Sequence, residues 1–205
     1  MLDLLPVIAA AFGIPQYLPQ LLKLRRTGDT AGVSWSWATL TSINNAAWFG
    51  YFMASGYWTA SLPSTAAASL AGTLSVMLVR RGALNARAVG WIAGWAALLV
   101  VGAMVGGRIG LGTLLAAASI VQVTPSLWTA YRTAHSTGIS AGTWALVLGE
   151  LSCWLVFGLR NADVRLTALG ATGVLASLLM LARARATNRR RVVTGDAVDA
   201  GNGRA

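Results

Sequence analysis

A sixteen-residue pattern occurs twice in the chain, 106 positions apart. The first copy begins at Pro19 and reads PQLLKLRRTGDTAGVS, and the second begins at Pro125 and reads PSLWTAYRTAHSTGIS. Both copies follow an apolar run, carry Arg-Thr at the same offset and close with Gly-apolar-Ser before another apolar run. Such a repeat dictates the architecture of a chain, and in an integral membrane protein it usually builds a transport site at its interface.

The composition indicates a membrane protein. Hydrophobic residues make up 56% of the chain and charged residues 11%, whereas a soluble domain carries about 25% charged residues. The formal charge of +10 does not predict nucleic-acid binding, because the basic residues gather at the ends of apolar runs and in the tail, as orientation signals do. The bilayer is therefore the expected partner.

The apolar runs are long enough to cross about 30 Å of hydrocarbon as helices, since each residue adds about 1.5 Å. We therefore predict an all-α integral membrane protein with seven transmembrane helices. The predicted spans are 4–23, 36–55, 59–79, 89–105, 109–130, 141–159 and 165–182.

The distribution of arginine and lysine predicts the orientation. One side holds most of the basic residues and the tail, and the other side holds only Arg108, Arg160 and Arg165. The positive-inside rule then places the tail in the cytoplasm and Met1 outside. Arginine predominates over lysine in a chain rich in Ala and Gly, which favours a bacterial source and hence the inner membrane.

The offset between the copies carries the chain across four predicted spans, so both copies have the same orientation. This predicts two parallel triple-helix bundles joined by a linker helix, a 3+1+3 layout. The predicted units are the first bundle at 1–83, the linker at 84–107, the second bundle at 108–183 and a disordered basic tail at 184–205.

Few residues suggest chemistry outside the spans. Cys153 is the only cysteine, so an intrachain disulfide is excluded. The only histidine, His135, lies in a polar loop, where solvation is the usual role. The sequence has no Gly-rich phosphate loop, zinc-ligand spacing or nucleophile elbow. We expect no catalytic residues, no metal site and no cofactor.

Prolines inside the spans predict hinges. Pro15 and Pro19 stand one turn apart in the first span, and Pro125 matches Pro19 in the fifth. Each proline removes a backbone donor, and such a break is tolerated in a membrane only where protein or a watery cavity satisfies the freed carbonyl. A static kink is the alternative. Gln20 lies beside Pro19, where its amide could bond a freed carbonyl or a neighbouring helix.

The second and sixth spans carry the sharpest group of candidate binding residues. Asn44 and Trp48 share a helix face at a spacing of four, and Glu150 and Trp154 have the same spacing at the repeat offset. All four fall near mid-span. Two facing indoles could clamp a ring-shaped or planar solute, although packing is the alternative.

Glu150 is the only acid deep in any predicted span. A carboxylate there costs at least about 2.5 kcal/mol and is a functional candidate by default. It could carry a proton, bind a cationic group, or donate a hydrogen bond to Asn44 in its neutral form.

With Pro19-Gln20, the Gly32-Val33-Ser34 end of the loop and the Trp48 segment, the chain resembles the PQ-loop family, and most closely its SWEET/SemiSWEET sugar-transporter branch. The second copy keeps the proline and the Gly-Ile-Ser end but has Ser126 where the motif expects Gln. The resemblance implies two triple-helix bundles around a central pocket, proline-hinged alternating access, and pocket tryptophans at Trp48 and Trp154.

That branch usually carries an Asn on the third helix of each bundle, where this chain offers Ser64-Thr65 and Gly170-Ala171-Thr172. We therefore expect a transporter of a small polar solute, first a sugar moved by facilitated diffusion. The second hypothesis is an amino-acid-type solute moved with a proton through Glu150, because relatives with the same motif do this. A third, of another class, is a membrane receptor or sorting protein. Homo-oligomerisation is left open.

Overall fold

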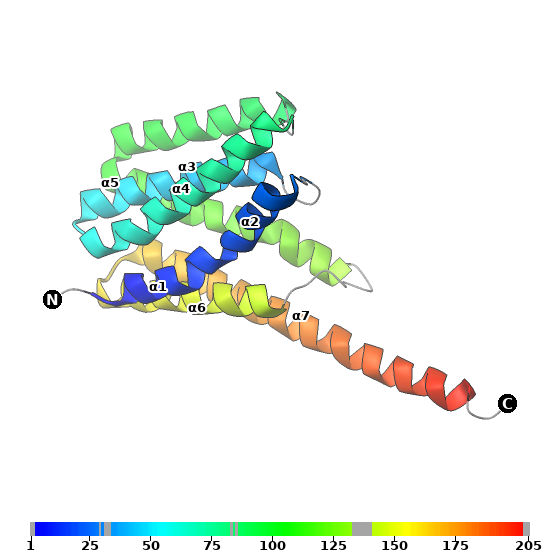
Figure 1. Cartoon of the computed structure of the whole chain (residues 1–205). Helices are drawn as coiled ribbons and strands as arrows, with labels where there is room; N and C mark the ends of the chain where they lie inside the picture. Colours follow the sequence, from blue (N-terminus) through cyan, green and yellow to red (C-terminus); the bar gives the residue numbers. More distant parts are fainter. Residues whose placement is uncertain are drawn as a thin grey trace.

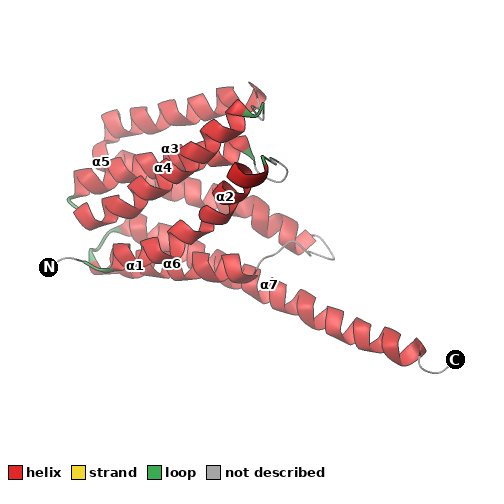
Figure 2. Cartoon of the chain, in the orientation of Figure 1, coloured by secondary structure: helices red, strands yellow, loops and turns green. Residues whose placement is uncertain are grey.

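The computed structural model describes residues 3–28, 30, 34–82, 84, 86–132 and 141–202, without the side chains of residues 19, 20, 23, 125, 126, 129 and 187–202. Helices account for nearly all of this part of the chain, and it contains no strand (Figure 2). The elements are α1 (Leu5–Gly13), the 3-10 turn η1 (Ile14–Gln16), α2 (Leu18–Thr27), α3 (Trp35–Ser55), α4 (Trp58–Arg80), α5 (Ala86–Arg132), α6 (Ala141–Arg160) and α7 (Val164–Asn202).

Four helices are long and apolar enough to cross a membrane by length and composition. They are Trp58–Arg80, Ala86–Thr124, Ala141–Arg160 and Val164–Ala186. Two of the other predicted spans are also helical but fall short of this standard. The first is interrupted at η1, and α3 carries Ser, Thr and two Asn residues that lower its hydropathy. The apolar helices support the prediction of an all-α membrane protein.

The fourth and fifth predicted spans form the two arms of α5, which meet at Gly107. The backbone of Gly107 has φ 56° and ψ −147°, a conformation that essentially only glycine adopts. The chain reverses there, so that the second arm runs back beside the first (Figure 1). The arms touch at Gly102 and Gly110, where a β-carbon on Gly110 would collide with the Gly102 carbonyl oxygen. A single residue thus replaces a loop between two long helices.

The helix α2 continues in the general direction of α1, and from α2 on, successive helices and the two arms of α5 run in opposite directions (Figure 1). The helix α1 starts at the same end of the molecule as α7. The helix α1 packs against α6 and α4, α3 packs against α4 and α5, and α7 packs against α6 and α5. Arginines mark the two ends unequally. We call the end that contains Arg25, Arg26, Arg80, Arg81, Arg87 and Arg132 the basic end, and the other, which contains Gly107, the opposite end.

The last helix differs from the prediction. The segment 184–205 was expected to be a disordered tail, but α7 continues through it to Asn202 and extends away from the other helices at the basic end (Figure 1). Alanine and arginine are both good helix formers, and the segment ARARA that follows Leu181 is made of them alone. Local propensity therefore extends the helix beyond its last packed turn.

Candidate functional site

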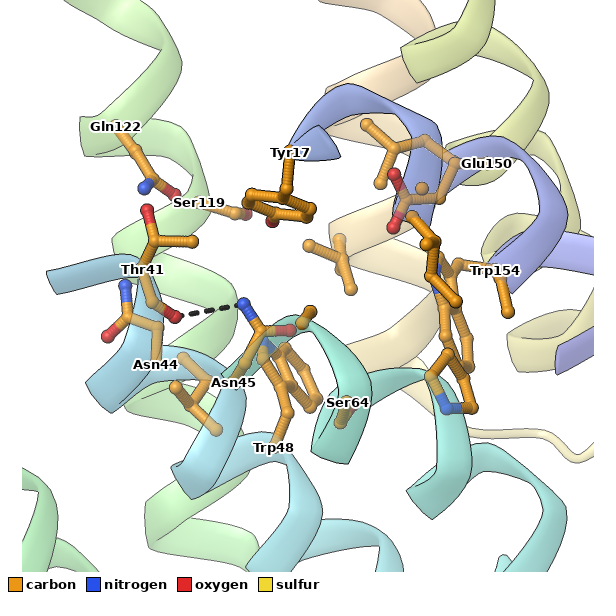
Figure 3. Close-up of a pocket in the computed structure, with 18 of the residues that line it drawn as sticks. Tyr17, Thr41, Asn44, Asn45, Trp48, Ser64, Ser119, Gln122, Glu150 and Trp154 are labelled. Atoms are coloured by element: carbon orange, nitrogen blue, oxygen red, sulfur yellow. Dashed lines mark hydrogen bonds between the residues drawn. The ribbon is translucent and has the colours of Figure 1, made fainter. Parts of the chain in front are cut away.

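A cavity of about 220 Å³ lies in the middle of the helices. Its walls come from α1, η1, α3, α4, α5, α6 and α7, so that segments far apart in sequence meet around it. Polar side chains and aromatic rings face each other across it (Figure 3). The volume lies below the 300–1,000 Å³ typical of sites for drug-sized ligands, which fits a small solute.

The four predicted binding residues all line this cavity. Asn44 and Trp48 come from α3, and Glu150 and Trp154 come from α6. The indoles are almost fully enclosed by protein, with exposed fractions of 8% for Trp48 and 6% for Trp154. Their pairing as repeat mates therefore corresponds to a pairing in space around one cavity.

The two indoles do not face each other across open space, because Phe52 lies between them. The Phe52 ring stacks on Trp154 with centroids 5.2 Å apart and planes 9° apart, and on Trp48 with centroids 5.6 Å apart and planes 24° apart. The three rings form a continuous apolar wall of the cavity. A planar solute would stack against this wall rather than slide between the two tryptophans.

Glu150 is held from the first half of the chain. The Gln16 side-chain amide donates to Glu150 Oε2 at 2.9 Å, and also to the Phe12 carbonyl oxygen at 3.3 Å. A β-carbon at Gly13 would lie 2.8 Å from Glu150 Oε1, so this glycine leaves the room that the carboxyl group occupies. A hydrogen bond to Asn44 was one of three roles considered for Glu150; among the described contacts, the amide that bonds Glu150 is that of Gln16.

Asn44 bonds elsewhere. Its Oδ1 accepts a hydrogen bond of 2.7 Å from Trp95 Nε1 on the first arm of α5. Gln122 is the repeat mate of Gln16 and also lines the cavity, but it makes no side-chain hydrogen bond within the described part of the chain. The two repeat-related amide positions therefore differ. Gln16 donates to the carboxyl group of Glu150 on α6, whereas Asn44 on α3 accepts its hydrogen bond from Trp95 and not from Gln122.

The predicted hinge residues behave differently in the two copies. Pro15 lies in η1, where the helix changes to 3-10 geometry, and Pro19 lies in the first turn of α2. Pro125 lies inside α5, in which Gly107 is the only residue with non-helical dihedral angles. The side chains of Pro19, Gln20 and Pro125 lie outside the described residues. The backbone thus has a break at the first copy and a continuous helix at the second.

Several lining residues were not singled out from the sequence as binding candidates. Asn45 donates to the Thr41 carbonyl oxygen at 2.9 Å, and Tyr17 stacks with Trp37 at a centroid distance of 6.2 Å. Tyr17 directly precedes α2 and Trp37 lies in the first turn of α3, which starts at the basic end (Figure 1). The other unforeseen lining residues include Phe52 and Ser119. Asn45 could have been suspected, because a second amide beside Asn44 in a span is equally costly in a bilayer.

At the opposite end, the two halves of the chain are joined by buried contacts. Tyr51 donates to Asp163 Oδ2 at 2.6 Å, and Asp163 Oδ1 accepts from the first backbone amides of α7, at Arg165 and Leu166. The rings of Tyr57 and Phe157 meet edge to face at 5.2 Å. Burial, and secondly the nearby Asp163 carboxylate, raise the pKa of Tyr57, so its phenol stays protonated.

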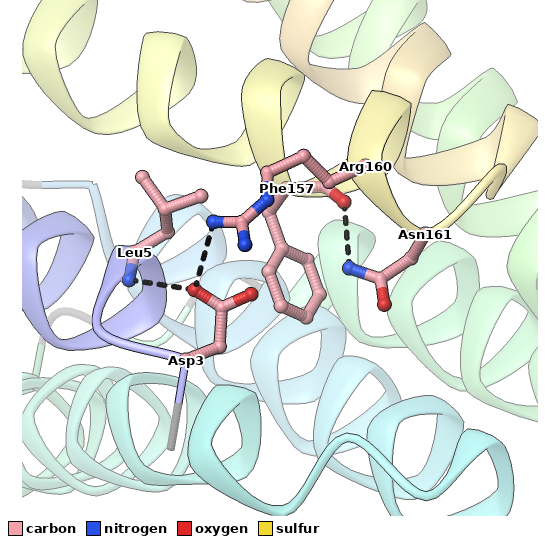
Figure 4. A network of polar contacts seen from close by, with 5 residues as sticks. All are labelled: Asp3, Leu5, Phe157, Arg160 and Asn161. Atoms are coloured by element: carbon pink, nitrogen blue, oxygen red, sulfur yellow. Dashed lines mark hydrogen bonds and ion pairs between the residues drawn. The ribbon is translucent and has the colours of Figure 1, made fainter. Parts of the chain in front are cut away.

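A second polar group ties the start of α1 to the end of α6 (Figure 4). Asp3 Oδ1 accepts from the Leu5 backbone amide at 3.1 Å and lies 3.7 Å from Arg160 Nη1. Asn161 donates to the Phe157 carbonyl oxygen at 2.8 Å and ends the helix. These contacts close the opposite end, whereas α2 beyond η1 packs on α4 of its own half.

Comparison with protein-family models and with curated proteins found no match. Within the described residues, no group of three or more His, Cys, Asp or Glu side chains could hold a metal ion. The assignment of a function therefore depends on the cavity itself and on the repeat that surrounds it.

Proposed function

We propose that the protein is a membrane transporter of a small polar solute, of the PQ-loop type and similar to the SWEET branch, with seven spans in a 3+1+3 layout. The observation that carries the proposal is the central cavity, which the repeat mates Asn44 and Glu150, and Trp48 and Trp154, all line. Membrane transporters commonly bind their solutes at such an interface between repeats.

Contacts at the opposite end support the parallel repeat. Tyr51 contacts Asp163; at the offset of 106, their mates are Phe157 and Tyr57, and these two rings also meet. A rotation that exchanges the two halves would generate one contact from the other at the same end of the molecule. An inverted repeat would instead put the mates at opposite ends.

The same contacts suggest how access alternates. The opposite end is held shut by Tyr51, Asp163 and the aromatic wall, while the break at η1 turns α2 toward α4 at the basic end. A solute then exchanges with the basic, cytoplasmic side in this conformation. Opening of the opposite end requires the Tyr51–Asp163 bond to break and the α1–α6 contact to rearrange.

A sugar moved by facilitated diffusion is the first candidate. The cavity offers amides, hydroxyls and a stacked aromatic wall, and these groups suit a polyhydroxylated ring. Ser64 takes the place near which the sugar branch carries an Asn, and its buried hydroxyl belongs to the cavity lining. Uptake of a panel of radiolabelled sugars and amino acids into liposomes tests this directly. A receptor or sorting protein would bind a solute without flux.

One observation favours a second candidate, proton-coupled transport of an amino-acid-type solute. Among the described residues that line the cavity, Glu150 is the only carboxylic acid, and the Gln16 amide donates a hydrogen bond to it. Replacement by Gln keeps the size of the side chain but removes the titratable proton. If Glu150 couples transport, Glu150→Gln loses uptake driven by a pH gradient; if the protein is a sugar uniporter, the variant transports nearly as well as the parent at every pH.

A further inference from the structure

A second hollow, of about 370 Å³, lies outside the cavity between α3 and the two arms of α5. We call it the α5 groove. Its walls are Trp91 and Trp95 from the first arm and Leu114, Ala118 and Val121 from the second. Trp95 uses its only polar atom on Asn44, so it presents an apolar ring to the groove. The groove is therefore suited to an apolar occupant.

The α5 groove adjoins the central cavity. Asn44 and Gln122 line both spaces, so these two amides stand in the partition between them. Gln122 is exposed and makes no side-chain hydrogen bond within the described residues. An amide without a partner is costly in hydrocarbon, so a polar atom of a ligand or of cavity water must approach it.

The walls of the groove face the hydrocarbon of the bilayer. Both arms belong to a helix that is long and apolar enough to cross a membrane, and Trp91 is 85% and Val121 71% exposed on its surface. An exposed apolar face at this depth contacts lipid chains, since no water is present there. An acyl chain is thus the occupant that the surroundings supply.

The spacing along the first arm matches a phospholipid of one leaflet. Arg87, Trp91 and Trp95 follow at intervals of four and share one helix face, with Arg87 at the basic end. From Arg87 to Trp95 the helix rises about 12 Å, and one leaflet contributes about 15 Å of hydrocarbon. The Arg87 guanidinium therefore lies at the depth of the headgroup phosphate, and the α5 groove lies at the depth of the acyl chain of the same phospholipid.

We propose that the α5 groove binds one phospholipid from the leaflet at the basic end, with its phosphate at Arg87 and one acyl chain along Trp91 and Trp95. The chain passes Gln122 near the level of Trp91, and its end lies beside Trp95 and Asn44, at the partition of the central cavity. A bound chain supports the Trp95–Asn44 contact from outside, so the occupancy of the groove affects the shape of the cavity. The site does not depend on which solute the cavity takes.

Photo-cross-linking of the full chain in nanodiscs tests the proposal. The probe is phosphatidylglycerol with a diazirine in the distal half of one acyl chain, added at increasing fractions to nanodiscs of phosphatidylcholine, whose headgroup carries no net charge, and labelled peptides are identified by mass spectrometry. Labelling around Ala118 and Val121 should reach a plateau, whereas labelling at Met104 and Val105, which are 81% and 85% exposed, should rise in proportion to the probe.

Matched variants separate the groove from the general lipid surface. Ala118→Phe fills the groove and should lower the plateau at least about fivefold, the lower end of what overpacking costs. Ala97→Phe makes the same change on the exposed face, about 200° around the helix from Trp95, and should leave the plateau unchanged. Arg87→Gln should raise the probe fraction at half-saturation about fivefold, through the loss of one cation near the phosphate.

Proportional labelling of both regions in the parent protein would overturn the proposal, and this measurement needs no variant to fold. Equal plateaus in Ala118→Phe and Ala97→Phe would overturn it as well. Absence of labelling around Ala118 and Val121 while Met104 and Val105 are labelled would show that protein, not lipid, covers the groove. If the probe fraction at half-saturation were unchanged in Arg87→Gln, the lipid phosphate would not be bound at Arg87.

Discussion

The two copies of the repeated motif begin with the same proline but have different backbones. In the first half, the chain passes from α1 through η1 into α2. The direction of the helix changes at η1, which is itself part of the cavity wall. In the second half, the arm of α5 that contains Pro125 stays helical throughout. Pro15, which lies in η1, has Val121 as its mate. The break therefore coincides with Pro15, which has no proline at the matching position, and not with Pro19, which is matched by Pro125.

This difference suggests that the two halves of the repeat share the positions of their helices but have different roles at the cavity. The repeat fixes where Trp48 and Trp154, or Gln16 and Gln122, lie around the cavity. Single residues without a mate then decide which half bends and which half stays straight. The first half supplies the break and the Gln16 that holds the acid, and the second half supplies the acid and a continuous helix.

The largest effect is expected at the aromatic wall, where the halves should be equivalent. Trp154→Ala removes a ring that stacks on Phe52, and uptake should fall about 100-fold, as expected from the loss of about 3 kcal/mol of contacts. Trp48→Ala should cause a similar loss, and Trp128→Ala, at an exposed ring away from the cavity, should not. Liposome uptake, normalised to folded protein, provides the measurement. If Trp154→Ala kept full flux, Trp154 and Trp48 would serve only in packing and not in solute binding.

The next effect concerns the bond that joins the halves at the opposite end. Tyr51→Phe removes a buried hydrogen bond to a carboxyl group, worth about 2 kcal/mol, and should lower the melting temperature by about 4–8 °C. Tyr131→Phe removes an exposed bond within the second half, from Tyr131 to the Leu179 carbonyl oxygen, and should lower it by less than about 2 °C. Equal shifts in thermal unfolding would mean that the halves are not held together at Tyr51.

The proline substitutions test the contrast between the two copies directly. Pro15→Ala restores a backbone donor at η1 and should slow uptake about tenfold, because a shift of about 1.4 kcal/mol toward a straight helix is enough. Pro125→Ala should change uptake by less than about twofold, since the helix is already continuous there. Initial rates of solute exchange in liposomes decide the matter. If both substitutions slowed uptake to a similar extent, the two copies would act as a symmetric pair of hinges, and the contrast between the two copies would be wrong.

The smallest effect comes from a single methyl group beside Glu150. In Gly13→Ala the new β-carbon would lie 2.8 Å from Glu150 Oε1, at the end of a flexible side chain that can move aside. The helices should stay in place while the bond from Gln16 weakens, and uptake should fall about fivefold for a loss of about 1 kcal/mol. The mate of Gly13 is Ser119, and Ser119→Ala should have little effect. A fall of the same size in Ser119→Ala would contradict the asymmetric role of the acid.

Much of the helical framework could be predicted from the sequence, because hydropathy and span length are properties of local segments. The helices begin and end within a few residues of most predicted spans, and α3 starts after the capping residue Ser34, whose hydroxyl accepts from the Trp37 amide. The continuation of α7 to Asn202 was not predicted, because the segment is polar, basic and Gly-containing and was expected to be a disordered tail. The reversal at Gly107 falls in the gap between the predicted spans 89–105 and 109–130.

The site was predictable only in part. Repeat spacing brought Asn44, Trp48, Glu150 and Trp154 to one cavity. Their partners were not predictable, because Gln16 meets Glu150 and Trp95 meets Asn44 across more than 50 residues of sequence. Phe52 was overlooked for a different reason. Its mate is Gly158, so a search for matched pairs could not select it.

That mismatch bears on how such a chain can evolve. Phe52 touches both Trp48 and Trp154, so in the proposed parallel repeat it stands close to the axis that relates the halves. Two identical subunits would have to place either two such rings or none in this gap. In the second half a β-carbon at Gly158 would already lie 2.8 Å from the Leu166 carbonyl carbon, so the position stays bare. Fusion of two repeats into one gene permits one large residue opposite one small residue on the axis, which a symmetric homodimer cannot encode.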